Sequence, residues 1–164
     1  MYCLILLILT VGQALARCPN GWTAHGDSCY HVSRDEASWV EATRMCELHS
    51  AYLTKVQTSY EETFLSSIVR SLHHGHTFWL GGSDWTTEGE WVWEPEGTPF
   101  LYKDWANKQP DNHANQDHCL ALEGSVHFQW TDENCQDTNR YICERSAYSD
   151  IVTTIAPIIE TAGV

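Results

Sequence analysis

The placement of cysteines constrains the fold of this chain more than any other feature. One of its seven cysteines, Cys3, lies in an apolar N-terminal stretch. The other six form an even set that favours three disulfides in an oxidising compartment: Cys18, Cys29, Cys46, Cys119, Cys135 and Cys143. A zinc site is disfavoured, because it would need close pairs such as C-x-x-C and even the nearest two, Cys135 and Cys143, are farther apart. Spacing alone leaves fifteen possible pairings of six cysteines.

The N-terminal stretch has the features of a secretory signal peptide. An apolar run from Leu4 to Val11 is followed by the small-residue pattern Ala14-Leu15-Ala16. The run is too short to cross a bilayer, which takes about 20 apolar residues, and no later run is long enough. We therefore expect residues 1–16 to be removed and a secreted chain to begin near Arg17.

Length and charge limit the class of protein. Removing residues 1–16 from the 164-residue chain leaves 148 residues, which suits one domain on a prior of ~100–200 residues each. The formal net charge is −13, with 22 acidic residues against nine lysines and arginines. Nucleic acid and anionic membranes are therefore disfavoured as partners, whereas metal ions, cationic surfaces and neutral polyols remain.

Two amphipathic helices are predicted in the first half of the chain. Ser38 and Glu41 form a capping box at the start of one helix. Its expected buried face consists of Trp39, Ala42, Met45 and Cys46. The second helix is predicted to open near Ser59 with Glu62 as its capping-box partner. Its apolar stripe consists of Phe64, Leu65, Ile68, Val69 and Leu72.

The second half of the chain has a different pattern. After His76, short aromatic and aliphatic runs are broken by Gly, Pro, Asn and Asp, which indicates short strands and long loops. The expected fold class is therefore α+β. Four tryptophans are expected to fill the core rather than to stack on sugars: Trp79, Trp91, Trp93 and Trp105.

Oxygen ligands for a metal are concentrated around Gln109-Pro110-Asp111. Gln109, Asp111, Asp117 and Asp132 supply one amide and three carboxylates, and Ca²⁺ takes six to eight oxygen ligands. Three carboxylates would offset the charge of the ion and leave positions at which two neighbouring sugar hydroxyls could bind it. The alternative is an acidic loop that binds no metal.

Several short motifs together resemble the C-type lectin-like domain in its long, six-cysteine form. They are Cys18-Pro19-Asn20-Gly21-Trp22 with Cys29-Tyr30, the helix from Trp39 to Cys46, Trp79-Leu80-Gly81-Gly82, and Trp91-Val92-Trp93. The chain is also similar to small secreted invertebrate lectins, including perlucin-like proteins. The resemblance implies a domain at residues 17–145, with two helices, short antiparallel strands and a long calcium-binding loop. It also implies three disulfides, Cys18–Cys29, Cys46–Cys143 and Cys119–Cys135.

The resemblance further implies a calcium site. Its expected ligands are Gln109, Asp111, Asp117, Thr131 and Asp132, with the peptide bond before Pro110 in cis. Thr131 stands where the family usually has an Asn ligand, and a hydroxyl oxygen is a weaker calcium ligand than an amide carbonyl. Asp117 is one methylene shorter than the usual Glu. A lowered metal affinity is therefore expected.

The order of amide and acid bears on which sugar binds. In this family Gln-Pro-Asp is associated with galactose-type ligands and Glu-Pro-Asn with mannose-type ligands. Each metal-bound hydroxyl receives a hydrogen bond from an amide and gives one to a carboxylate. Exchanging the amide and the acid therefore reverses the order of donor and acceptor that the two hydroxyls meet. His113 would offer a small aromatic platform, or it is a solvated loop histidine. The expected sugar-binding residues are Gln109, Asp111, His113, Asp117 and Asp132.

A second calcium site of the family matches Asp84, Glu88 and Asn112, with His118 at a further ligand position. Two carboxylates of that site are missing here, so a second calcium ion is expected to bind weakly.

The leading hypothesis is a secreted, calcium-dependent lectin for galactose-type glycans that acts in innate recognition. Homo-oligomers would raise the avidity of weak single sites, and the tail at residues 146–164 is open to self-association or disorder. The alternative is an acidic extracellular-matrix, biomineral-binding or protein-binding member of the family with a degenerate sugar site. No nucleophile and base stand out, so no enzymatic activity is expected.

Overall fold

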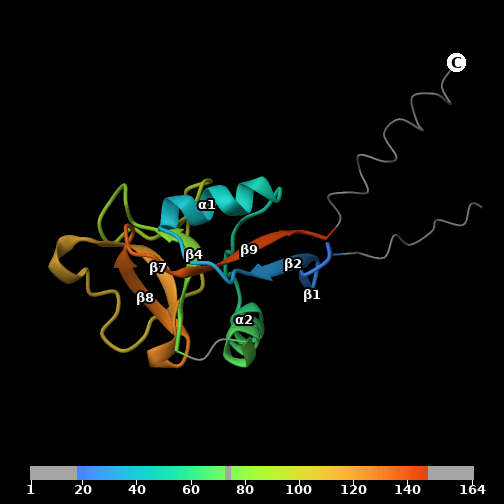
Figure 1. The fold of residues 1–164 in the computed structure, drawn as a ribbon. Coiled ribbons are helices and arrows are strands. Elements are labelled where there is room, and N and C mark those ends of the chain that lie inside the picture. Colours follow the sequence, from blue (N-terminus) through green and yellow to red (C-terminus); the bar gives the residue numbers. More distant parts are fainter. Residues whose placement is uncertain (1–17, 73–74, 148–164) are drawn as a thin grey trace, which may run out of the picture.

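The computed structural model describes residues 18–72 and 75–147, shown as a ribbon in Figure 1. The predicted signal peptide, and the predicted tail beyond Ala147, lie outside these ranges. In chain order the elements are β1 (Thr23–His25), β2 (Ser28–Val32), α1 (Trp39–Leu48), β3 (Tyr52–Leu53), α2 (Ser59–Leu72), β4 (Thr77–Ser83), β5 (Val92–Trp93), β6 (Thr98–Pro99), η1 (His113–Asn115), β7 (Asp117–Glu123), η2 (Gly124–Val126), β8 (Gln129–Asn134) and β9 (Arg140–Ser146). The α+β class is confirmed. Within the described ranges no helix is long and apolar enough to cross a membrane.

The strands run in the order β1-β2-β9-β4-β5-β6, with β3 beside β9 and β7 between β4 and β8. Among the described strands the pairings are antiparallel, except that of β4 with β9, which is parallel. Helices α1 and α2 lie on opposite sides of the β2–β9 pair (Figure 1). Strands β7 and β8 and the long loop before them form the end of the domain that is farthest from β1 in this view.

Helix α1 begins where the sequence predicts. Ser38 accepts a hydrogen bond from the Glu41 amide, and the Glu41 carboxylate accepts one from the Ser38 amide, which completes the capping box. Ala42 and Cys46 are buried. The prediction for Met45 is wrong, since 40% of its surface is exposed, because the helix meets the sheet along the line of Ala42 and Cys46.

Helix α2 is capped one residue earlier than predicted. The Thr58 hydroxyl accepts a hydrogen bond from the Glu61 amide at 3.2 Å, and the Glu61 carboxylate in turn accepts one from the Gln57 amide. Glu62 is therefore not the capping partner. Leu65 and Val69 are buried as expected, while Phe64 and Ile68 pack at the margin of the core. The side chain of Leu72 lies outside the described part of the structure.

Glu62 instead points into the core, where only 5% of it is exposed. Its carboxylate accepts hydrogen bonds from Trp130 Nε1 at 2.7 Å and from the Ser66 hydroxyl at 2.9 Å. Burial raises the pKa of Glu62 to about 7, although both hydrogen bonds act in the opposite direction. The folded chain therefore holds a proton on Glu62 at pH values where the unfolded chain has lost it.

We expect this proton to make stability fall as pH rises. A carboxyl whose pKa is raised on folding contributes stability below its unfolded pKa and loses it as pH rises through its folded pKa, here between about 4.5 and about 7. The loss amounts to about 3 kcal/mol. Glu62→Gln keeps a hydrogen-bonding side chain of the same shape but has no carboxyl to titrate. Between pH 4.5 and pH 8, the free energy of unfolding should therefore fall by about 3 kcal/mol more in the wild type than in Glu62→Gln.

Urea titrations in chelator at the two pH values measure this difference. Glu47→Gln is the matched control, because Glu47 is an exposed glutamate on α1. Equal pH dependence in the wild type and in Glu62→Gln would show that Glu62 does not carry the effect.

The core confirms the predicted role of the aromatic motifs. Trp79, Trp91 and Trp93 are buried, and Trp105 packs, partly buried, against the cluster that contains Trp91 and Trp93. The two glycines after Leu80 are required by close packing, because a Cβ on Gly81 would collide with the Leu53 carbonyl oxygen and one on Gly82 with the Phe100 ring. The structure also contains the three expected disulfides, Cys18–Cys29, Cys46–Cys143 and Cys119–Cys135.

Candidate calcium and sugar site

The candidate site is built on the long loop that precedes β7. The loop is fixed at its start by Ala106, whose amide donates to the Trp130 carbonyl at 2.9 Å. The Gln109-Pro110 peptide bond is cis, as expected. Asn112 has a left-handed backbone with φ of 40°, a conformation that Asn tolerates better than most residues. The loop then closes through η1 into β7.

Asp132 holds this loop against strand β8. Only 3% of Asp132 is exposed, and its two carboxylate oxygens accept hydrogen bonds from successive loop amides, Asp111 at 3.0 Å and Asn112 at 2.7 Å. The Gln109 amide oxygen also accepts from the Asp111 amide at 3.0 Å. A buried carboxylate on a strand therefore positions the Gln109-Pro110-Asp111 turn.

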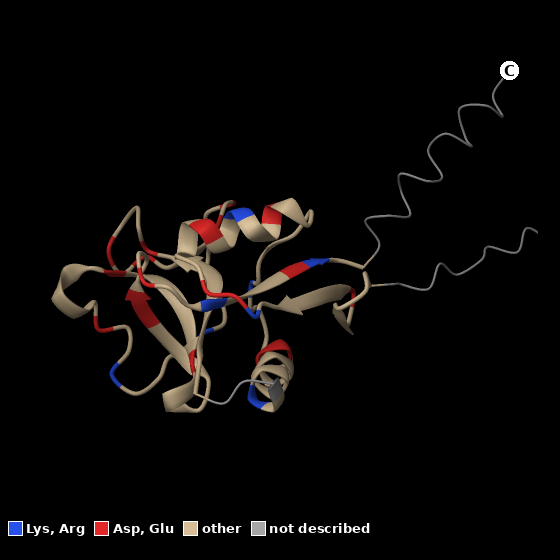
Figure 2. Cartoon of the chain, in the orientation of Figure 1, with Lys and Arg blue, Asp and Glu red and all other residues tan. Residues whose placement is uncertain are grey.

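These residues surround a hollow of about 420 Å³ at the domain surface. Four of the five predicted metal ligands line it, as does the predicted sugar contact His113, which is exposed. The hollow is lined by Gln109, Asp111, His113, Ala114, Gln116, Asp117, Asp132, Glu133, Asn134 and Asp137. Acidic residues are spread over the ribbon, and several lie at this end of the domain (Figure 2). The structure thus brings together acids that lie up to 26 positions apart in the sequence, from Asp111 to Asp137.

Thr131 is placed differently from the other predicted ligands. It is 4% exposed, does not line the hollow, and donates its hydroxyl to Glu133 Oε1 at 2.9 Å. Its role as a ligand stays a prediction. Glu133, which is not among the predicted ligands, borders the hollow. A register shift in β7 between Asp117 and Cys119, opposite this part of β8, accompanies the arrangement.

Three neighbouring carboxylates of the hollow are buried or half-buried: Asp117, Asp132 and Glu133. Burial raises the pKa of Asp132, and burial together with the charge of Asp132 raises the pKa of Asp117. Burial also raises the pKa of Glu133 to about 6. Such crowding favours a bound cation, whose charge would offset the repulsion between the acids.

The donor set fits calcium. Carboxylate and amide oxygens surround the hollow, and Ca²⁺ prefers six to eight such ligands in flexible geometry. Gln109, Asp111, Asp117, Asp132 and Glu133 would hold the ion. An ion in this position would also offer exposed coordination sites to neighbouring hydroxyls of a sugar.

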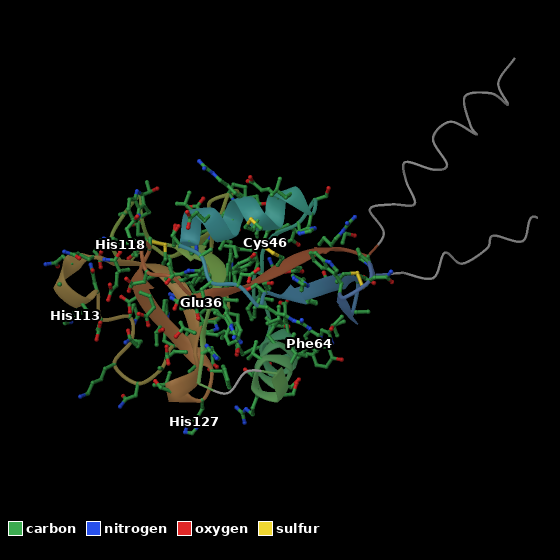
Figure 3. The ribbon with its side chains drawn as sticks, viewed as in Figure 1. Glu36, Cys46, Phe64, His113, His118 and His127 are labelled. Atoms are coloured by element: carbon green, nitrogen blue, oxygen red, sulfur yellow. A yellow bond between two sulfur atoms is a disulfide. The ribbon has the colours of Figure 1, made fainter. Side chains whose placement is uncertain are left out.

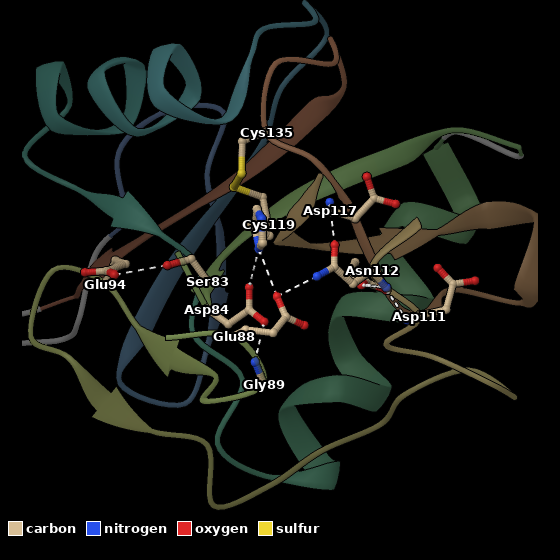
Figure 4. Close-up of polar contacts among 12 residues, drawn as sticks. Ser83, Asp84, Glu88, Gly89, Glu94, Asp111, Asn112, Asp117, Cys119 and Cys135 are labelled. Carbon is tan, nitrogen blue, oxygen red and sulfur yellow. Dashed lines mark hydrogen bonds and ion pairs between the residues drawn. A yellow bond between two sulfur atoms is a disulfide. The ribbon is translucent and has the colours of Figure 1, made fainter. Parts of the chain in front are cut away.

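The residues predicted for a second calcium site also lie together. Ligand atoms of Asp84, Glu88 and His118 lie within 4.8 Å of one another. Asn112 joins this cluster to the hollow, since its side-chain nitrogen donates to Glu88 Oε2 and its side-chain oxygen accepts from the Asp117 amide at 3.2 Å (Figure 4). Asn112 therefore links the residues of the hollow to the cluster of Asp84, Glu88 and His118.

The chain matches one family of known proteins. The family profile described as "Lectin C-type domain" matches residues 35–145. A perlucin-like protein of Mytilus galloprovincialis is 33% identical over 132 residues, covering 79% of this chain and 84% of that protein. The galactose-specific lectin nattectin of Thalassophryne nattereri is 30% identical over 135 residues, covering 82% and 84%.

Among solved structures, the carbohydrate-recognition domain of the mouse scavenger receptor C-type lectin superposes with a TM-score of 0.73 at 29% identity. The match covers 79% of this chain and 98% of that domain. The profile match spans most of the described domain and includes both helices, the loop and the hollow. The chain therefore belongs to the C-type lectin domain family.

Proposed function

We propose that this chain is a secreted, calcium-dependent lectin for galactose-type glycans. The observation that carries the proposal is the hollow, in which side-chain amides and several carboxylates meet beside a loop anchored by Asp132. The similarity to the galactose-specific lectin nattectin supports it. Innate recognition of microbial or self glycans, in homo-oligomers that raise avidity, is the role we infer for such a site.

The residues of the hollow have distinct tasks in this mechanism. Calcium would bind two adjacent sugar hydroxyls directly. The Gln109 amide would donate a hydrogen bond to one hydroxyl, and Asp111 would accept one from it or from its neighbour. His113 is exposed at the edge of the hollow, where its ring would contact the apolar face of the sugar. Binding of this kind requires no catalytic group.

Binding to immobilised galactose and mannose, with calcium and with chelator, tests the proposal. We expect the wild type to bind galactose only with calcium. The double exchange Gln109→Glu with Asp111→Asn keeps the size and net charge of the turn but reverses its donors and acceptors, so we expect the preference to move toward mannose by about tenfold or more.

Two outcomes would contradict the proposal. Galactose binding that persists in chelator would exclude the calcium mechanism. Absence of binding to either sugar by the folded, calcium-loaded wild type would favour the alternative of an acidic matrix or protein-binding member of the family.

A further inference from the structure

We propose that Asp84, Glu88 and His118 form a Zn²⁺ site rather than a second Ca²⁺ site. Asp84 directly follows β4, Glu88 lies in the loop after it, and His118 is near the start of β7. Figure 4 shows Asp84 and Glu88 directed toward the same point, with Asn112 beside them. The proposal does not depend on sugar binding at the neighbouring hollow.

Asp84 is the fixed member of this cluster. Its side chain is 1% exposed, with Oδ1 lying 3.0 Å from His118 Nδ1 and Oδ2 accepting from the Gly89 amide at 2.8 Å. A carboxylate that is both buried and hydrogen-bonded in this way has little freedom to move. It therefore presents one oxygen to the imidazole in a defined position.

The other two ligands are oriented by separate contacts. The His118 ring meets the Trp85 ring edge-on, with centroids 5.7 Å apart. Glu88 Oε2 lies 3.5 Å from His118 Nδ1 and accepts a hydrogen bond from the Asn112 side chain. In a tetrahedral zinc site with bonds of about 2.0–2.1 Å, ligand atoms lie about 3.4 Å apart. The observed separations of 3.0 and 3.5 Å need only small adjustments to reach this value.

The ligand types select zinc over calcium. Ca²⁺ needs six to eight oxygens, but this cluster offers two carboxylates and a nitrogen. Zn²⁺ takes histidine nitrogen and carboxylate oxygen, often as three protein ligands with one water. The two carboxylates would neutralise its charge. Glu88 and His118 are accessible to solvent, so the ion has a path into the site.

Replacing His118 provides a reciprocal test. His118→Asp substitutes an oxygen ligand for the nitrogen, so the variant should lose zinc and gain calcium. The matched control is His127→Asn, because His127 is an exposed histidine that lies away from His118 (Figure 3) and Asn tolerates its left-handed backbone.

Zinc bound by the mature, oxidised chain is measured by equilibrium dialysis in saturating calcium, which keeps the hollow occupied. We expect His118→Asp to bind one equivalent of zinc fewer than the wild type and one equivalent of calcium more, with His127→Asn unchanged. Glu88→Gln changes only an exposed side chain, so it should also lose the zinc equivalent even if His118→Asp misfolds. Equal zinc binding by the wild type and Glu88→Gln would overturn the proposal and leave Asp84 and His118 as a hydrogen-bonded pair only.

Discussion

Asp132→Asn is expected to lower the calcium affinity of the chain at least about 100-fold. The substitution removes a charge from a buried position that is 3% exposed and borders the hollow. It also disturbs the loop, because both oxygens of Asp132 accept from loop amides and an asparagine offers only one oxygen. One of the amides of Asp111 and Asn112 would then face a donor rather than an acceptor.

Calcium titration by calorimetry checks this expectation. Asp137→Asn is the matched control, since Asp137 lies on the rim of the same hollow but is exposed and makes no hydrogen bond to the loop through its carboxylate among the described contacts. We expect its effect to be less than about threefold. Similar losses in both variants would mean that the hollow attracts calcium through overall charge rather than through a site organised by Asp132.

The fold class and five of the residues that border the hollow could be predicted, because the sequence signals for them are local. The turn Gln109-Pro110-Asp111 is a contiguous motif, and Asp132 belongs to the short sequence Trp130-Thr131-Asp132. The pairing of six cysteines came with the family resemblance, since spacing alone left fifteen choices. Each of these features could be identified without knowing which distant segments meet.

Other features depended on distant contacts and were missed for that reason. Thr58 and Ser59 are each followed three residues later by a glutamate, so the capping pattern alone fits two registers. The contact of Glu62 with Trp130, 68 positions away, decides between them.

Glu133 was missed because it directly follows Asp132. In a regular strand, neighbouring side chains point to opposite faces, so only one of the two would be expected to face the hollow. Asp132 and Glu133 nevertheless both border the hollow, next to the register shift in β7. Such a bulge depends on how two strands pair, so the sequence of β8 by itself does not reveal it.

The disulfide Cys46–Cys143 is expected to contribute more to stability than any other single covalent link in the described domain. It joins α1 to β9 across 97 positions, and both cysteines are fully buried. The chain-entropy relation gives about 4.7 kcal/mol for a loop of about 100 residues. Replacing both cysteines with alanine should lower the free energy of unfolding by about that amount, which is a large share of the ~5–15 kcal/mol typical of a domain.

Removal of Cys18–Cys29 is the matched control, because that link closes a loop of only 11 positions. The same relation gives about 3 kcal/mol for such a loop, so urea denaturation should separate the two double variants by about 2 kcal/mol. Equal losses would show that loop length does not set the contribution and that packing around the sulfurs does. The long link also has a functional consequence, because β9 pairs with β4 and β4 pairs with β7, the strand that carries Asp117 and His118. A chain without it should therefore lose calcium binding at a lower urea concentration than the control.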